Sequence, residues 1–242
     1  NKDIIVMKKK IISIVGLLLL AVAPTKILAQ IEVAPIVDFG GISGPGFSKM
    51  GRTFGIGASV RYTFFQDSPS VSLQVRLDAQ YSNYYASSIE RNLFQNPDLA
   101  GKSPFRFRWQ DHVLNVPLTL GVRFNSFLNG NLSVRAGAYW TRGLKGSIHY
   151  IQTPIENMTF EPFDAYNTVV IPVPGKSNRL TIAENESRVG IIAAVDYRVW
   201  KQLELSASYM RDLNPTWVHG IVNDSQPPIK LNFFKIGAAY WF

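Results

Sequence analysis

The chain has 242 residues, of which 46% are apolar and 17% are charged, and this balance excludes a disordered chain and a helical membrane protein. The absence of cysteine excludes a disulfide framework and any thiolate site for a metal or a nucleophile. The formal net charge is +8, but lysines near the N-terminus account for much of it and no basic run follows, so nucleic-acid binding is not indicated.

The first predicted element is a cleaved signal peptide within residues 1–29. Lysines at 8–10 precede the apolar run "IISIVGLLLLAVA", and "KILAQ" supplies small residues for cleavage after Ala29. The apolar run is short for a transmembrane helix, which disfavours the alternative of a membrane anchor. We expect residues 1–6 to lie upstream of the natural start. The mature domain would then be 30–242, with 20 basic and 16 acidic residues.

Alternation of apolar and polar residues then recurs along the chain, most clearly in "VSLQVRLDAQYSNYY" at 71–85. Short turns and long segments alternate between these stretches, which is typical of outer-membrane barrels with periplasmic turns and outer loops. The predicted fold is all-β: an eight-stranded antiparallel up-and-down transmembrane β-barrel in a Gram-negative outer membrane, with both termini periplasmic. The predicted strands are about 31–41, 53–65, 71–85, 109–125, 131–142, 188–199, 203–212 and 230–242.

A soluble β-sandwich is the competing architecture, because its strands alternate too. Here the polar face is rich in Gly, Ser, Thr and Arg and carries full charges in strand centres, which suits a narrow lumen better than a wetted surface. Aromatic residues also gather near the strand ends, as membrane girdles do. The expected girdles are Tyr62, Phe64, Phe124, Trp200, Tyr240 and Trp241 on the turn side, and Tyr81, Tyr84, Tyr85, Trp109, Trp140 and Tyr209 on the loop side.

The inward face is expected to hold six cations and five anions. Eight strands leave an interior just wide enough for side chains, so we predict a lumen closed by ion pairs, with an anion path as the alternative. The turn near Lys201 places Arg198 opposite Glu204, and we expect these two to pair. The predicted lumen charge network is Arg61, Arg76, Asp78, Arg123, Arg135, Asp196, Arg198, Glu204 and Lys235, with Glu32 and Asp38 as further inward acids.

The last predicted strand, "NFFKIGAAYWF", is apolar on one face to its final residue. We expect it to close the barrel against the first strand and to be recognised there by the barrel-assembly machinery. Its outward residues include Phe234, Ile236, Tyr240 and Phe242.

Four short motifs resemble strands of a known family. "HVLNVPLTLGVRF" resembles the L-x-I-P-L-x-L-x-x-x-F strand of PorT-like outer-membrane β-barrel proteins, with Pro117 at mid-strand, where a ladder donor is lost. "LSVRAGAYWTRGL", "SASYMRDL" and "IGAAYWF" are similar to other strands of that family. The resemblance spans most of 31–242. It implies the barrel fold and its location, and it implies as an alternative function a part in an assembly or secretion system.

No catalytic constellation stands out. The histidines His112, His149 and His219 have no serine at a two-residue spacing, and Asp111 and His112 should point to opposite faces of a strand. "GGISGPGF" lacks the G-K-[ST] ending of a phosphate loop, and we see no metal-ligand spacing. We therefore expect no cofactor and no enzyme activity, with an outer-membrane hydrolase as the least favoured alternative.

The long segment 143–187 is too apolar for a loop that only meets water. We expect it to extend the fifth and sixth strands beyond the lipid of the outer membrane and to bind a protein partner. The predicted function is thus a membrane platform with a binding surface on its outer loops. The candidate contact residues are Tyr150, Phe160, Phe163 and Tyr166.

Overall fold

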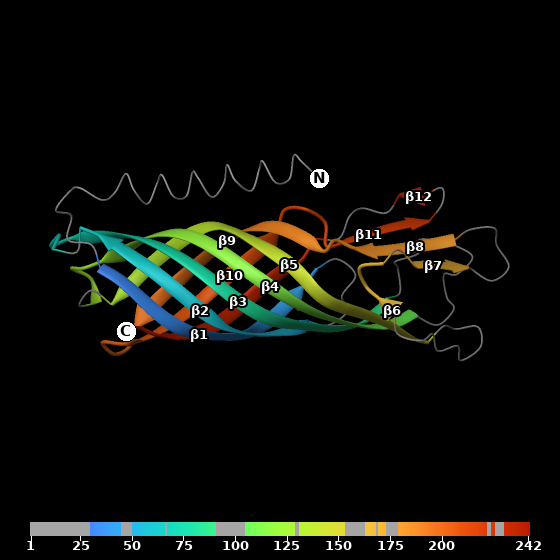
Figure 1. Ribbon diagram of the computed structural model, residues 1–242, viewed down its shortest axis with the longest axis horizontal. Coiled ribbons are helices and arrows are strands. Elements are labelled where there is room, and N and C mark those ends of the chain that lie inside the picture. The colour runs from blue at the N-terminus through green and yellow to red at the C-terminus, as the bar shows by residue number, and fades with distance from the viewer. Residues whose placement is uncertain are drawn as a thin grey trace.

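Eight long strands form a closed antiparallel barrel in the computed structural model (Figure 1), which confirms the predicted fold class. Each strand pairs with its neighbours in the barrel, and the last strand pairs with the first along eight residues. The structure describes residues 30–44, 50–65, 67–90, 105–128, 131–152, 163–167, 169–172, 179–221, 224–225 and 230–242. The predicted signal peptide and Phe160 lie outside these ranges.

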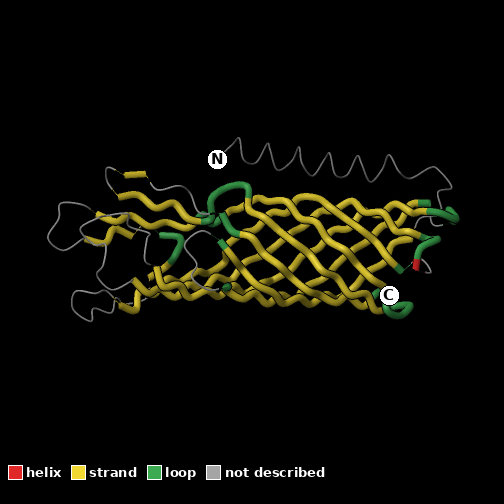
Figure 2. The backbone as a smooth tube through the Cα atoms, turned by 180° about the vertical axis from the view of Figure 1, so that it is seen from behind, coloured by secondary structure: helices red, strands yellow, loops and turns green. Residues whose placement is uncertain are grey.

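The barrel strands are inclined to the barrel axis, as Figure 2 shows from behind. Both the start of the first strand and the C-terminus lie at the same end of the barrel, the end with the short turns (Figure 1). The strands are β1 (Gln30–Ser43), β2 (Gly51–Phe64), β3 (Val71–Glu90), β4 (Phe105–Phe124), β5 (Leu132–Gln152), β9 (Ser187–Arg198), β10 (Leu203–Asp212) and β13 (Asn232–Tyr240).

A second, smaller sheet lies at the opposite end of the molecule, at the right in Figure 1. It has the order β12-β11-β8-β7, and its strands are β7 (Val169–Pro172), β8 (Arg179–Glu184), β11 (Trp217–Ile221) and β12 (Asp224–Ser225). A two-residue strand, β6 (Phe163–Asp164), pairs with β5 nearby. We refer to these five strands, with the ends of β3, β4 and β5 beside them, as the outer extension.

The third strand is longer than predicted and the second sheet was not predicted, whereas the fifth strand continues into the segment 143–187, as expected. β3 continues to Glu90 and β5 to Gln152. Beyond the apolar part of the barrel the outward residues become polar, for example Ser87 and Arg108. Alternation therefore fades there while the backbone ladder continues.

The outward surface of the barrel is an apolar belt. Between the turn end and the upper edge of this belt, the described outward residues of all eight barrel strands are uncharged, and several are strongly exposed, such as Leu120 at 67%. No helix in the described ranges is long and apolar enough to cross a membrane. The upper edge of the belt is formed by Phe39, Phe54, Tyr81, Leu114, Trp140, Val189, Tyr209 and Phe234.

The terminal strand has the predicted orientation. Phe234, Ile236, Tyr240 and Phe242 face outward, and the backbone N–H of Phe242 donates to the carbonyl oxygen of Val33 at 3.0 Å. The ladder between β3 and β4 is interrupted where Asp78 and Ala79 would pair with Pro117 and Val116. A proline has no N–H to donate, which accounts for the break.

Candidate functional site

The interior of the barrel holds a chain of buried ion pairs that begins near the turn end. Arg61, on the inward face of β2, is only 2% exposed. Its Nε lies 2.7 Å from Glu32 on β1, and its Nη1 lies 2.6 Å from Glu204 on β10. One guanidinium therefore links three strands across the lumen.

The chain continues through the two arginines of the barrel centre. Arg76 Nε lies 2.8 Å from Asp78 and Arg76 Nη1 lies 3.1 Å from Glu204. Arg135 Nε lies 2.8 Å from Asp196 on the neighbouring strand β9. Alternation places all of these side chains inward, and the length of arginine lets each one reach a carboxylate on another strand.

The predicted pairing of Arg198 with Glu204 is wrong, although the two residues are opposite one another in the β9–β10 register. Arg198 Nη2 instead lies 3.2 Å from Glu32, while Glu204 binds Arg61 and Arg76. Strand register sets which backbones are adjacent, but in a narrow barrel long side chains also meet across the lumen. Glu204 is deeper than Arg198, which remains part-exposed near the rim.

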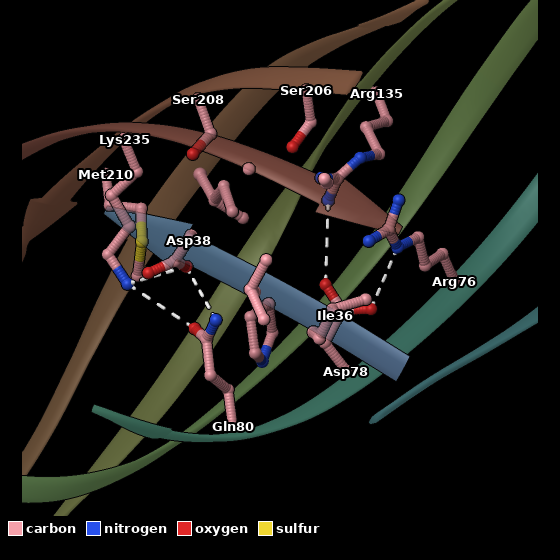
Figure 3. A pocket seen from close by; sticks show the side chains of 15 residues that line it. Ile36, Asp38, Arg76, Asp78, Gln80, Arg135, Ser206, Ser208, Met210 and Lys235 are labelled. Carbon is pink, nitrogen blue, oxygen red and sulfur yellow. Dashed lines mark hydrogen bonds and ion pairs between the residues drawn. The ribbon is translucent and has the colours of Figure 1, made fainter. Parts of the chain in front are cut away.

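Two further predicted cations have different partners. Arg123 is half-buried and faces the side-chain amide of Gln74; with the amide oxygen turned toward the guanidinium, Nε and Nη2 donate to it at 3.1 and 2.9 Å. Lys235 Nζ lies 3.2 Å from Asp38, whose carboxylate also accepts from Gln80 at 2.6 Å (Figure 3). The lysine group thus forms a separate cluster above the arginine chain.

A small polar cavity lies between these two groups. Its volume is about 30 Å³, and its lining includes Asp38, Arg135, Ser206, Ser208 and Lys235 (Figure 3). A cavity of this size with several polar groups suits one or two water molecules. Within the described residues, Asp38 Oδ1 and Arg135 Nη1 have no hydrogen-bond partner, so they are natural ligands for such water.

Three aromatic residues expected in the membrane girdles lie inside the barrel instead. Trp241 is 2% exposed and its ring lies 3.7 Å from the Arg61 guanidinium carbon, in a cation–π contact. Tyr84 and Trp109 are also buried. Each shares the inward face of its strand, Trp241 with Lys235 and Trp109 with Asp111. Their position near a strand end suggested a girdle, but alternation decides which face they occupy.

A second buried cluster, which the sequence analysis missed, lies at the outer end of the lumen. Arg188 binds two carboxylates, with Nη2 at 3.0 Å from Asp111 and Nη1 at 2.9 Å from Glu184. Trp109 Nε1 donates to Glu184 at 2.9 Å. The sequence signal was the inward parity of Asp111 and Arg188 in their strands. Glu184 could not be placed this way, because it belongs to the second sheet.

The same cluster connects the outer extension to the barrel. The hydroxyl of Tyr166 donates to Asp111, and burial raises the pKa of Tyr166, so this residue remains a donor. The hydroxyls of Tyr139 and Thr216 donate to Asp212 at 2.5 and 2.6 Å. Side-chain contacts at the outer end of the lumen therefore connect β5 and β8 with the segments that precede β7 and β11.

Of the four candidate partner residues, only Tyr166 has a described side chain. Tyr166 was expected to face a partner, but its hydroxyl points to Asp111 in the barrel interior. Tyr150 lies in β5 and Phe163 in β6, and only their backbone positions are described. The prediction for these two residues and for Phe160 thus stays open.

His112 faces away from the acidic residues of the lumen. Asp111 points inward and His112 outward, as alternation predicts. His112 Nδ1 lies 2.5 Å from the hydroxyl of Tyr81 and 3.2 Å from Nδ2 of Asn83. His149 is half-buried on β5. In the described ranges, no group of three or more His, Asp or Glu side chains is arranged to hold a metal ion.

Neither a protein-family model nor a curated protein matches the chain. Solved structures with a similar arrangement include Ail from Yersinia pestis in complex with the heparin analogue sucrose octasulfate, with 12% identity and a TM-score of 0.37 over 88% of this chain and 99% of that chain. Neisserial surface protein A has 10% identity and a TM-score of 0.36 over 88% and 99%. OprG from Pseudomonas aeruginosa has 8% identity and a TM-score of 0.33 over 88% and 95%.

These likenesses are too distant to carry a functional argument. The closed strand pairing and the apolar outward belt themselves define the class, which is an eight-stranded β-barrel of the outer-membrane type. The resemblance to PorT-like proteins stays a prediction.

Proposed function

We propose that this protein is a non-enzymatic outer-membrane platform, with a lumen closed by its own side chains and an outer extension that binds a protein partner. The observation that carries the first half is the buried ion-pair chain from Glu32 through Arg61 and Glu204 to Arg76. Both termini of the barrel domain would lie in the periplasm, and β13 would present its apolar face to the barrel-assembly machinery.

The cost of leaving a buried charge unpaired supports a closed interior. Removing a charge from a buried pair leaves an uncompensated partner, so an ion that enters must either displace a paired group or remain unpaired. Arg61, Arg76 and Glu204 are each at most 6% exposed at the side chain. The cavity of about 30 Å³ beside them has room for little more than one or two waters.

The outer extension supports the second half of the proposal. Within the described strands, β7 pairs only with β8, and no described strand occupies its other edge. Its sequence, "VVIP", is apolar and β-branched, which favours pairing with an added strand. An extended segment of a partner protein that adds to this edge is the interaction we infer.

Site-specific crosslinking in intact cells tests this function. A photoreactive residue at Val170 in β7 should give a crosslinked species of one defined mass, because the partner strand would lie beside it. The matched control carries the same residue at Gln202, in the exposed turn at the opposite end of the barrel. Deletion of 169–178 should abolish the capture while the barrel still folds. Equal crosslinking at both positions, or none at Val170, would contradict partner binding at this edge.

A further inference from the structure

A group of basic residues faces outward just above the apolar belt on one side of the barrel. Arg52 lies on β2, Arg108 on β4 and Lys145 on β5, and all three side chains are exposed. We call these three residues the outer basic patch. They follow the last apolar outward residues of their part of the wall, such as Phe54 and Leu114.

The backbone register brings the patch together across four neighbouring strands. Arg52 is opposite Tyr85 on β3, and Tyr85 is opposite Gln110 on β4. Lys145 is opposite His112, two residues along β4 from Gln110. Arg108 lies two residues beyond Gln110 in the other direction, and successive same-face residues of a strand are separated by about 7 Å.

Described carboxylates do not neutralise the charges of the patch. In the part of the chain that the structure describes, no carboxylate lies within ion-pair distance of Arg52, Arg108 or Lys145. The outward Arg142 differs, because its Nη2 lies 2.6 Å from Glu186. The three patch residues therefore keep their charge available for a ligand.

A neighbouring ring positions Arg52, and hydrogen-bonded polar side chains lie between the patch residues. The Arg52 guanidinium carbon lies 4.7 Å from the centre of the Tyr85 ring, a cation–π contact that directs this side chain toward β3 and leaves its N–H donors free. His112 contacts the hydroxyl of Tyr81 and the amides of Asn83 and Gln110. The patch thus has an ordered polar floor.

We propose that the outer basic patch binds the phosphate groups of a phosphorylated lipid in the leaflet around the outer end of the barrel. The patch is continuous with the lipid-facing belt: Arg52 lies one same-face position beyond Phe54, Lys145 follows the exposed Leu144, and Arg108 lies three same-face positions beyond Leu114. This places the cations above the apolar surface, on the side of the lipid head groups. Arginine binds phosphate through two parallel N–H donors, and lysine adds a point charge. A lipid fits better than free phosphate, because its acyl chains would cover the exposed belt below.

The inference uses only the part of the proposed function that places the barrel in a membrane, and it is independent of any protein partner. Purified protein in uncharged detergent is titrated with diphosphorylated lipid A and followed by native mass spectrometry. The test variant is Arg52→Gln/Arg108→Gln/Lys145→Gln. The control variant, Lys201→Gln/Arg211→Gln/Lys230→Gln, also removes three charges but leaves the patch intact. Resistance to SDS before boiling reports that each variant is folded.

We expect the test variant to bind lipid A at least tenfold more weakly and the control variant to bind like the wild type. Fully dephosphorylated lipid A should bind weakly to all three proteins, and inorganic phosphate at the same concentration should not displace the lipid. If the triple variant fails to fold, the single variants Arg52→Gln and Lys145→Gln are tested instead, and each should lose less lipid A affinity than the triple variant. Unchanged binding by the patch variants, equal binding of dephosphorylated lipid, or displacement by inorganic phosphate would overturn the proposal.

Discussion

Arg61 Nη1 lies 2.6 Å from a carboxylate oxygen of Glu204, although the two residues are 143 positions apart in the chain. The Nε of the same guanidinium lies 2.7 Å from Glu32. Arg61 therefore joins β1, β2 and β10 inside the barrel, at a point where none of the three side chains meets solvent freely. The stability of this contact depends on all members being present, because a single deletion leaves a buried charge.

Glu204→Ala should lower the free energy of unfolding by roughly 3–5 kcal/mol, since Arg61 and Arg76 would both lose a carboxylate. Adding Arg61→Ala should cost less than the sum of the two single changes, with a coupling energy of about 1–3 kcal/mol. Urea unfolding of the protein in lipid vesicles measures each value. The matched cycle of Glu204→Ala with Arg198→Ala should give a clearly smaller coupling. Equal coupling in the two cycles would contradict the pairing described here.

Gly57→Ala should impair folding more than Gly55→Ala, although both glycines lie on β2. A Cβ at Gly57 would lie 2.1 Å from the carbonyl oxygen of Ala79 and 2.7 Å from the Cα of Gln80, so the backbone of β3 would have to move. At Gly55 the nearest atoms, at 2.7 Å, are the side-chain ends of Asp38 and Gln80, which can rotate. We expect a loss of about 1–3 kcal/mol for Gly57→Ala, measured by the same unfolding assay. Similar losses at both positions would show that the strands adapt more than this geometry allows.

Attachment of the second sheet should weaken as the pH rises. Burial and the carboxylate of Asp111 raise the pKa of Glu184 above the usual 4.5, and Arg188 opposes this only in part. A folded pKa that is above the unfolded one gives stability that is fully present below the unfolded pKa and is lost as the pH rises through the folded pKa. Hydrogen-exchange protection factors of Arg179–Glu184 and Trp217–Ile221 should therefore fall as the pH is raised from 4.5.

Glu184→Gln is the control for this pH dependence. Its amide oxygen can still accept from Trp109 Nε1, but the side chain does not titrate. The protection factors of the second sheet should then be nearly independent of pH. An unchanged pH profile in the variant would assign the effect to another group of the cluster, such as Asp111.

The barrel itself could be predicted from sequence because lipid and lumen impose opposite demands on alternate residues. In β3, Leu73 and Leu77 face outward while Arg76 and Asp78 face inward, and their odd and even positions in the sequence distinguish the two faces. The same rule places Trp241 and Trp109 in the lumen, where the expectation of aromatic girdles had put them outside. Local periodicity was thus more informative than the position of a residue along its strand.

The contacts inside the barrel could not be predicted in the same way. The partner of Arg198 is Glu32, 166 positions away, because barrel closure brings β1 beside β13 and lets side chains meet across the lumen. Glu184 and Arg188 are close in the chain, but their contact forms across the break between β8 and β9, where alternation within one strand does not apply. Such pairs depend on strand tilt and on loop structure, neither of which appears in the alternation of a single segment.

Single-channel recording in planar bilayers tests the closed lumen most directly. The buried chain of Glu32, Arg61, Glu204 and Arg76 should block ion passage, so purified wild-type protein should give no steady conductance. A sixteen-stranded porin inserted in the same membranes is the positive control, because its interior is a water-filled channel. Absence of steps from folded, inserted protein is the predicted result. Reproducible single-channel steps from the wild type would contradict the closed lumen on which the proposed function depends.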